Sequence, residues 1–129
     1  MGTYHVNIYT AVLDHELNSP DGMVGRYLAE KGSKIVVAAK RQAGSRTGRL
    51  RASIHLQHMQ EGRMAAVKIG SSVGYALLHH EGSRPHAIVA KRAKTLRFAA
   101  GGRIIYTRAV AHPGTRANRY LSDNLILIK

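Results

Sequence analysis

Histidine is the residue type in this sequence that most invites a chemical role, because eight of the 129 residues are histidines. The densest group is His79, His80 and Glu81, with His86 and His112 further along the chain. Zinc needs ligands that converge on one point, as histidines four residues apart on a helix do. Adjacent His79 and His80 point in different directions on a helix or a strand, so they do not readily share one ion. We therefore expect no metal site and no cofactor.

Motifs for hydrolysis or group transfer are absent from the sequence. It contains no Gly-x-Ser-x-Gly, no glycine-rich phosphate loop ending in Lys-Ser or Lys-Thr, and no cysteine. The seven acidic residues are thinly spread, and Glu81 has no second carboxylate near it for acid–base work. The sequence therefore favours a binding or assembly role and not an enzyme.

The charge points to partners. The chain carries 20 Lys and Arg against 7 Asp and Glu, a formal net charge of +13. Seven basic residues fall between Glu30 and Glu61 and nine between Glu81 and Asp123, and neither stretch contains an acid. A small soluble domain ordinarily carries a net charge of only ~2–8. Such basic fields attract nucleic acid or an acidic protein surface.

The length suits one domain over residues 1–129. No apolar run approaches the ~18 residues of a membrane-spanning helix. Residues 1–10 lack the charged-then-apolar pattern of a secretion signal. We expect an intracellular protein with no membrane partner.

A long helix is expected over residues 20–42. Ser19-Pro20-Asp21 has the features of a helix start, and Ala43-Gly44 those of a helix end. Apolar residues recur on one face of this helix, at Val24, Leu28, Ile35 and Ala39. The stripe is interrupted at Lys31-Gly32, which argues for packing on a sheet and against a coiled coil.

Two strands are expected after the helix. Apolar and polar residues alternate from Leu50 to Gln57, which indicates a half-buried strand. Residues Ala65, Val67 and Ile69 repeat the pattern after a turn at Glu61-Gly62.

A second hairpin is expected around Gly101-Gly102, between residues 95–100 and 103–110. This turn places Phe98 opposite Ile105, Leu96 opposite Thr107, and Arg97 opposite Tyr106 in a cation–π contact. The long helix then packs on a sheet face that includes Ile54, Val67 and Phe98.

The segments around this hairpin complete the expected fold. Residues 75–81 form at most one helical turn, Gly82 to Pro85 form a turn, and residues 83–95 form an extended basic loop. Residues 118–124 form a short C-terminal helix, and Leu125–Ile128 is either a last strand or a tail that docks on a neighbouring subunit. The expected fold class is α+β, with an antiparallel sheet of four or slightly more strands, the long helix on one face and the short C-terminal helix.

A series of short motifs runs from about Leu17 to Leu125. In chain order they are Thr47-Gly48-Arg49-Leu50-Arg51-x-Ser53-Ile54, Tyr75-Ala76, Glu81-Gly82-x-x-Pro85-His86-x-Ile88, Lys94-x-Leu96-x-Phe98, and His112-Pro113-Gly114 with Arg119-Tyr120-Leu121. Their order and spacing resemble the small neck family of long-tailed bacteriophages. These are head-to-tail joining or tail-completion proteins, also described as minor tail components.

The resemblance implies an α+β virion protein without catalysis that forms a homo-oligomeric ring, with a hexamer favoured over a dodecamer. It implies a place in the neck between the DNA-filled head and the tail, after assembly in the host bacterial cytoplasm. The implied partners are a portal-side adaptor or head-closure protein, a tail terminator or tail-tube protein, and the viral DNA that passes through the channel.

Three sets of residues are candidate sites. The family-motif turns are Gly82, Pro85, His86, His112, Pro113 and Gly114, where we expect turn geometry and histidines that bond loop backbone. The basic arm, which we expect to contact a partner protein, carries Arg84, Lys91, Arg92 and Lys94. Candidates for facing the channel or its DNA are Arg46, Arg49 and Arg51.

Two alternatives remain open. The chain could be a tail terminator that caps the tail tube, which has a similar size and place in the particle. It could instead be a basic nucleic-acid-binding module, although aromatic residues make up only 5% of the chain. Tyr106 beside Arg97 is the one attractive base-stacking candidate.

Overall fold

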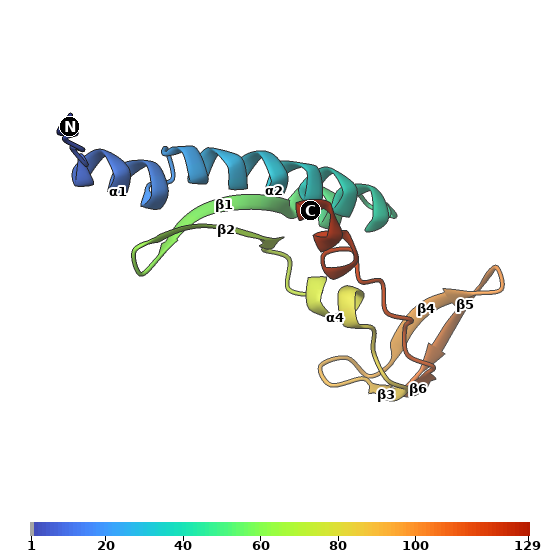
Figure 1. The fold of residues 1–129 in the computed structure, drawn as a ribbon. Coiled ribbons are helices and arrows are strands. Elements are labelled where there is room, and N and C mark those ends of the chain that lie inside the picture. Colours follow the sequence, from blue (N-terminus) through green and yellow to red (C-terminus); the bar gives the residue numbers. More distant parts are fainter. Residues whose placement is uncertain (1) are drawn as a thin grey trace. The chain divides into compact units, whose positions relative to one another are not determined.

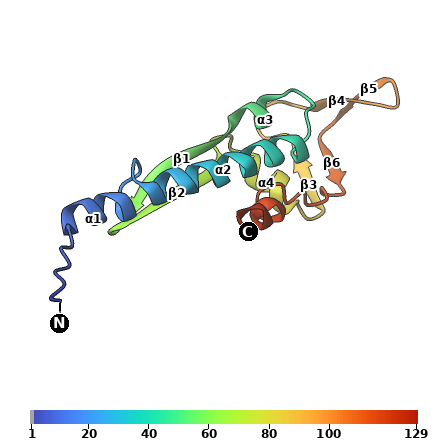
Figure 2. The same ribbon diagram turned by 45° about the horizontal axis from the view of Figure 1, so that its top comes forward.

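The computed structural model describes residues 2–129, which form an α+β fold (Figures 1 and 2). The elements in chain order are α1 (Thr10–Asn18), α2 (Met23–Gln42), α3 (Arg49–Ser53), β1 (Ile54–Glu61), β2 (Met64–Ser71), α4 (Ala76–Glu81), β3 (His86–Val89), β4 (Leu96–Ala100), β5 (Arg103–Thr107), β6 (Ala109–His112) and the 3-10 helix η1 (Ser122–Ile128). They cluster into two compact units, which we call the first unit (residues 2–76 and 119–129) and the second unit (residues 77–118).

The long helix α2 begins at Met23, so the expected start at Pro20 is wrong. Ser19-Pro20-Asp21 instead forms a corner after α1, where the Asp21 N–H donates to Ser19 Oγ at 3.3 Å. The first turn of α2 is held by Glu16, whose Oε2 accepts a hydrogen bond from the Met23 N–H at 2.8 Å. A carboxylate at this position also suits the positive end of the helix dipole. The helix α1 that carries Glu16 was not predicted from the sequence.

The apolar stripe of α2 packs on the hairpin of β1 and β2, as expected. Ile35 and Ala39 are buried, and Val24 and Leu28 are half-buried. A Cβ atom added at Gly32 would overlap Leu56 Cδ1 and contact Ile69 and Val67 at 3.5 Å. The interruption that the sequence shows at Lys31-Gly32 is therefore a place where the hairpin side chains pack closely against the helix backbone.

The segment from Leu50 to Ser53 is helical, which corrects the expected strand start at Leu50. Gly48 adopts a left-handed backbone with φ 74°, and α3 follows it as a single turn. Residues four apart on a helix share one face, so the turn directs Leu50 and Ile54 into the same core. Strand β1 begins only at Ile54 and extends to Glu61.

The β1–β2 hairpin turns at Gly62-Arg63, next to the expected position. Its antiparallel register runs from the pair Ile54 and Ser71 to the pair Glu61 and Met64.

The main core of the first unit is small. Its buried members are Ala39, Ala43, Leu50, Ile54, Ala76 and Tyr120. The Tyr120 hydroxyl donates to the Ala76 carbonyl oxygen at 3.3 Å, and burial raises the pKa of this phenol above its usual value of 10.0.

Within residues 2–129 the strands form three separate two-stranded sheets, so the expected four-stranded sheet is wrong. Hairpins β1–β2 and β4–β5 are local, whereas β3 pairs with the distant β6. The pairing of β3 with β6 closes the second unit on itself. Residues 83–95 are therefore not one extended loop, because His86–Val89 form β3.

The Gly101-Gly102 hairpin has the expected register, with Phe98 opposite Ile105, Leu96 opposite Thr107, and Arg97 opposite Tyr106. The contact between Arg97 and Tyr106 is a hydrogen bond from Nε to the hydroxyl at 3.2 Å, and not the expected cation–π contact. Phe98 is half-buried in the second unit and does not belong to the α2 core, which corrects its expected position.

The C-terminal apolar run lies in η1 and not in a strand. Helix formation starts at Ser122, four residues after the expected Asn118. Asp123 and Asn124 tie η1 to the end of α2, since Gln42 Nε2 donates to Asp123 Oδ2 and Asn124 Nδ2 donates to Gln42 Oε1, both at 2.8 Å. No helix within residues 2–129 has the length and apolarity to cross a membrane.

Candidate assembly interface

The six family-motif turn residues come together in the second unit, although they are far apart in the sequence. They flank a β-bridge in which Ser83 and Thr115 exchange both backbone hydrogen bonds at 3.0 Å. The Ser83 Oγ and Thr115 Oγ1 atoms also lie 3.1 Å apart. We call residues 82–86 and 112–115 the clasp. It joins the two ends of the second unit and begins the β3–β6 ladder.

Two glycines make the clasp possible. Gly82 and Gly114 have φ of 77° and 83°, a region that favours glycine. A Cβ atom at Gly82 would lie 2.6 Å from the Thr115 carbonyl oxygen, and one at Gly114 would overlap the Ser83 carbonyl oxygen. Both obstacles are backbone atoms and cannot move aside as a side chain does.

The clasp histidines bond to loop backbone, as the sequence predicts. His86 Nδ1 lies 2.8 Å from the Arg84 carbonyl oxygen, which only accepts, so this nitrogen carries the proton. His112 Nδ1 accepts a hydrogen bond from the Gly114 N–H at 3.0 Å. The two rings lie opposite each other with centroids 5.0 Å apart. Their role here is to fix the two loops of the clasp.

The remaining histidines of this region are also engaged. His80 Nδ1 lies 2.6 Å from Glu81 Oε1, and His79 Nε2 lies 3.4 Å from Asn118 Nδ2. Across residues 2–129, no three histidine or acidic side chains gather closely enough to hold a metal ion.

The basic-arm residues occupy both ends of strand β3. Arg84 stands at the clasp end, and the bends at residues 91–95 carry the other three, Lys91, Arg92 and Lys94. All four side chains are exposed, and none forms an ion pair with any residue from 2 to 129. They remain available to an anionic partner.

Arg108 joins this set, and sequence reasoning had not selected it. The Ala90 N–H donates to the Arg108 carbonyl oxygen at 2.9 Å, so Arg108 lies beside the chain that leads to Lys91. Only the non-local pairing of β3 with β6 brings them together. Overall, the second unit carries eight Lys and Arg against one acid, Glu81.

The channel candidates lie in the first unit. Arg46 precedes α3, while Arg49 and Arg51 lie on it, and all three are exposed. Successive helical residues are about 100° apart, so Arg49 and Arg51 point in roughly opposite directions around buried Leu50. The strand expected from the sequence began at Leu50 and included only Arg51 of this pair, whereas α3 carries both.

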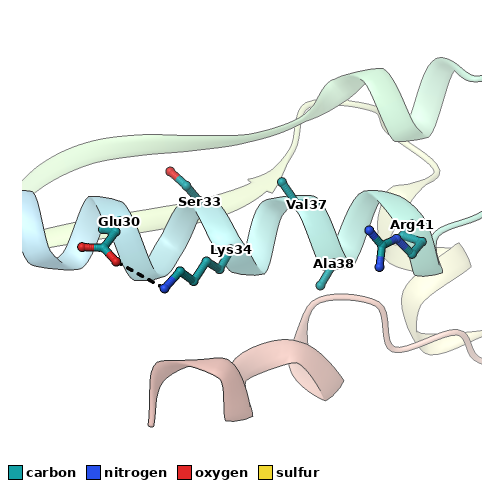
Figure 3. A pocket seen from close by; sticks show the side chains of 6 residues that line it. All are labelled: Glu30, Ser33, Lys34, Val37, Ala38 and Arg41. Atoms are coloured by element: carbon teal, nitrogen blue, oxygen red, sulfur yellow. Dashed lines mark hydrogen bonds and ion pairs between the residues drawn. The ribbon is translucent and has the colours of Figure 1, made fainter.

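The outer face of α2 carries a shallow hollow of about 580 Å³ (Figure 3). Its lining comes from this one helix: Glu30, Ser33, Lys34, Val37, Ala38 and Arg41. The single acid, Glu30, is paired with Lys34 Nζ at 3.2 Å. The hollow is an open surface around the exposed Val37.

Large apolar side chains are exposed over most of the chain, which is the feature that sequence patterning did not reveal. Those of residues 2–18 are all exposed; they are Tyr4, Val6, Ile8, Tyr9, Val12, Leu13 and Leu17. The four apolar residues of η1, Leu125 to Ile128, are exposed as well. In the second unit no residue is fully buried.

The accessible surface area of the chain shows how large this exposure is. The chain of 14.1 kDa exposes 10485 Å². A compact monomer of this mass exposes about 6,700 Å², and two separate globules of the sizes of the two units about 8,000 Å². The excess over the second figure, roughly 2,500 Å², exceeds the ~800 Å² that each partner buries in a standard interface. The isolated chain therefore exposes more surface than compact units of these sizes do.

No protein-family model matches the chain, and neither a curated protein nor a solved structure gives a significant match.

Proposed function

We propose that this chain is a structural subunit of the phage head-tail connector, which forms a ring at the neck and joins the DNA-filled head to the tail. The observation that carries the proposal is the excess of exposed surface, in which large apolar side chains are numerous. Contiguous apolar surface beyond a few hundred Å² marks interaction sites. Each subunit of a closed ring contacts a neighbour on either side, so two of its surfaces are covered only in the assembled ring.

The weak core of the second unit supports the same function. Residues 77–118 number about as many as the smallest chains that fold without disulfides or metals, ~40 residues. This unit has no fully buried residue, yet its clasp and register are well defined. Contacts with neighbouring subunits and with the flanking neck proteins would supply the missing burial.

The charge suits the proposed partners. The bends that carry Lys91, Arg92 and Lys94 have no acid of their own, so an acidic patch on a head-closure, adaptor or tail-tube protein is the favoured contact. DNA in transit must slide, so it calls for diffuse attraction and not for defined pairing. Arg46, Arg49 and Arg51 remain the candidates for such diffuse charge around the channel. In this proposal the protein assembles in the host cytoplasm and resides in the virion.

An antibody raised against the purified chain tests the location in the particle. Immunogold labelling of tailed particles is expected at the junction between head and tail. Label confined to the capsid, the tail tip or no particle at all would contradict the neck assignment. If isolated tails also carry the label at the end that would meet the head, the tail-terminator role would be favoured over the neck role.

A nucleic-acid-binding module is the second candidate, and one observation favours it. Tyr106 is 63% exposed, and Arg97 bonds its hydroxyl rather than stacking on its ring, so the residue could stack on a base. Backbone binding alone would fall steeply with salt. Sequence-selective binding that survives high salt and is lost in Tyr106→Ala would favour this function over the neck.

A further inference from the structure

The segment before α1 has the pattern of a strand without a partner. Tyr4, Val6 and Ile8 alternate with polar residues, and Tyr4 and Val6 are 92% and 83% exposed. Within residues 2–129, no backbone hydrogen bond reaches residues 3–8. Tyr, Val, Ile and Thr are residues that fit a pleated, half-buried surface. This segment is suited to pair with a sheet edge outside its own chain.

Helix α1 continues the same exposed surface. It has nine residues, none of them buried, and Val12, Leu13 and Leu17 are exposed. Isolated helices shorter than ~12–15 residues are marginal in water, and packing of an apolar face usually provides their stability. We call residues 3–18 the N-terminal arm. Its apolar side needs a covering surface.

The charge of the arm indicates which surface covers it. The N-terminal arm carries two acidic residues, Asp14 and Glu16, and no lysine or arginine. The second unit has the opposite balance, with eight basic residues and one acid. Complementary fields steer association and fix its register. The arm is therefore opposite in charge to the second unit of another copy.

Within the second unit, β5 offers the best edge. It pairs only with β4, so its other edge is open. Three consecutive apolar residues on it are exposed, Ile104, Ile105 and Tyr106, and Arg103 and Arg108 flank them. The β1–β2 hairpin of the first unit also has open edges, but Glu61 there partly offsets Arg63 and Lys68. An extended peptide added to an edge gains main-chain hydrogen bonds for affinity and side-chain contacts for specificity.

We propose that the N-terminal arm of one copy docks on the second unit of an adjacent copy, where residues 3–9 pair as a third strand along β5. This contact rests on the ring proposed above and names the two surfaces that close it. It joins two different patches, so it is head-to-tail and repeats around a ring. It also covers apolar surface on the arm and on a unit that has no buried residue of its own.

Cysteine cross-linking tests the contact in the full chain, which has no native cysteine. Val6 is central in residues 3–9 and Ile105 is central in β5, so they lie near each other for either strand direction. Purified V6C and I105C variants are mixed and treated with a short bis-maleimide cross-linker. The matched control is V6C mixed with Q57C, since exposed Gln57 is near the centre of β1 in the other hairpin. We expect a severalfold excess of the V6C–I105C product over the control product. Equal yields would overturn the pairing along β5.

Self-association of arm variants provides the second measurement. Val6→Asp places a charge on the apolar face, and Asn7→Asp places the same charge on the opposite face. We expect V6D to weaken association about tenfold or more by sedimentation, from the apolar burial it removes, and N7D to change it little. Neither residue is buried in the isolated chain, so the circular dichroism of both monomers is unchanged.

The outcomes separate this contact from the neck function. A wild-type ring without the V6C–I105C product, or with V6D as well associated as N7D, would overturn the arm placement and leave the proposed ring intact. Wild-type protein that stays monomeric from micromolar to millimolar concentration would overturn both the arm contact and self-assembly of the ring.

Discussion

His86 and His112 face each other across the first pair of the β3–β6 ladder, with ring centroids 5.0 Å apart. Each ring also bonds a backbone group of its own loop, His86 to the Arg84 carbonyl and His112 to the Gly114 N–H. The pair holds together two motifs that the sequence separates by two hairpin strands. The second unit depends on this clasp because it has no buried core.

The clasp glycines provide the first prediction. Gly114→Ala adds a Cβ that overlaps backbone at Ser83, in addition to the strain of a positive φ. We expect the variant to lose about 1–3 kcal/mol of local stability and the hydrogen-exchange protection of the Ser83 and Thr115 amides. The matched control is Gly101→Ala, which also has a positive φ but open space around the added Cβ. If both variants keep protected clasp amides, the backbone overlap does not matter.

Core substitutions distinguish the two units. Ile54 is fully buried in the first unit, so Ile54→Ala is expected to cost about 2–5 kcal/mol in chemical denaturation. Phe98 is half-buried in the second unit, so Phe98→Ala should cost less than half as much and leave the α2 core intact. Equal losses in the same unfolding transition would mean that Phe98 shares that core.

Tyr120 predicts a loss of stability at alkaline pH. Burial raises the pKa of its phenol above 10.0 in the folded state, so the folded protein holds this proton more tightly than the unfolded chain. The stabilisation of the folded state that this tighter proton binding reflects is fully present below pH 10.0, and it is lost as the pH rises through the raised pKa of the folded state.

Tyr120→Phe provides the measurement. At neutral pH this variant should cost about 0.5–1.5 kcal/mol, from the lost hydrogen bond to the Ala76 carbonyl. The difference between wild type and variant should shrink above pH 10.0. Parallel stability curves for the two proteins up to the highest measurable pH would contradict a buried, neutral phenol.

Local signals in the sequence predicted local structure well. The Gly101-Gly102 turn determined the β4–β5 register, because a two-residue turn leaves no other alignment. The apolar stripe of α2 was also correctly predicted. The start of α2 was not, because the side chain that binds its first turn, Glu16, belongs to a separate helix.

Non-local pairing accounts for the main errors. Alternation around Leu50 suits a strand, but the i and i+4 spacing of Leu50 and Ile54 suits a helical turn equally well, and the core favours the turn. The pairing of β3 with β6 depends on the clasp, which no local pattern reveals. Among the candidate residues, the sequence named the turn residues that the structure brings together in the clasp, but it did not bring Arg108 to Lys91. It also gave no sign that the N-terminal arm is uncovered.

The basic arm provides a functional prediction. Replacing Lys91, Arg92 and Lys94 together by Ser should leave the fold intact, because all three side chains are exposed and unpaired within residues 2–129. Under the proposed neck function, joining of filled heads to tails should be blocked, because an acidic surface on the partner would lose its counter-charges. The control removes the same charge elsewhere, in Arg63→Ser, Lys68→Ser and Lys129→Ser combined. If the triple variant at Lys91, Arg92 and Lys94 gives the wild-type yield of infectious particles, the basic arm does not bind a partner.

The central claim is that this protein joins heads to tails, and electron microscopy of particles made without it tests this most directly. Under the proposed neck function, interruption of its gene should leave DNA-filled heads and separate, complete tails in the same lysate. Purified wild-type protein added to that lysate should restore joined, infectious particles, whereas the Lys91, Arg92 and Lys94 variant should not. Normally joined particles in the absence of the protein would contradict the neck function.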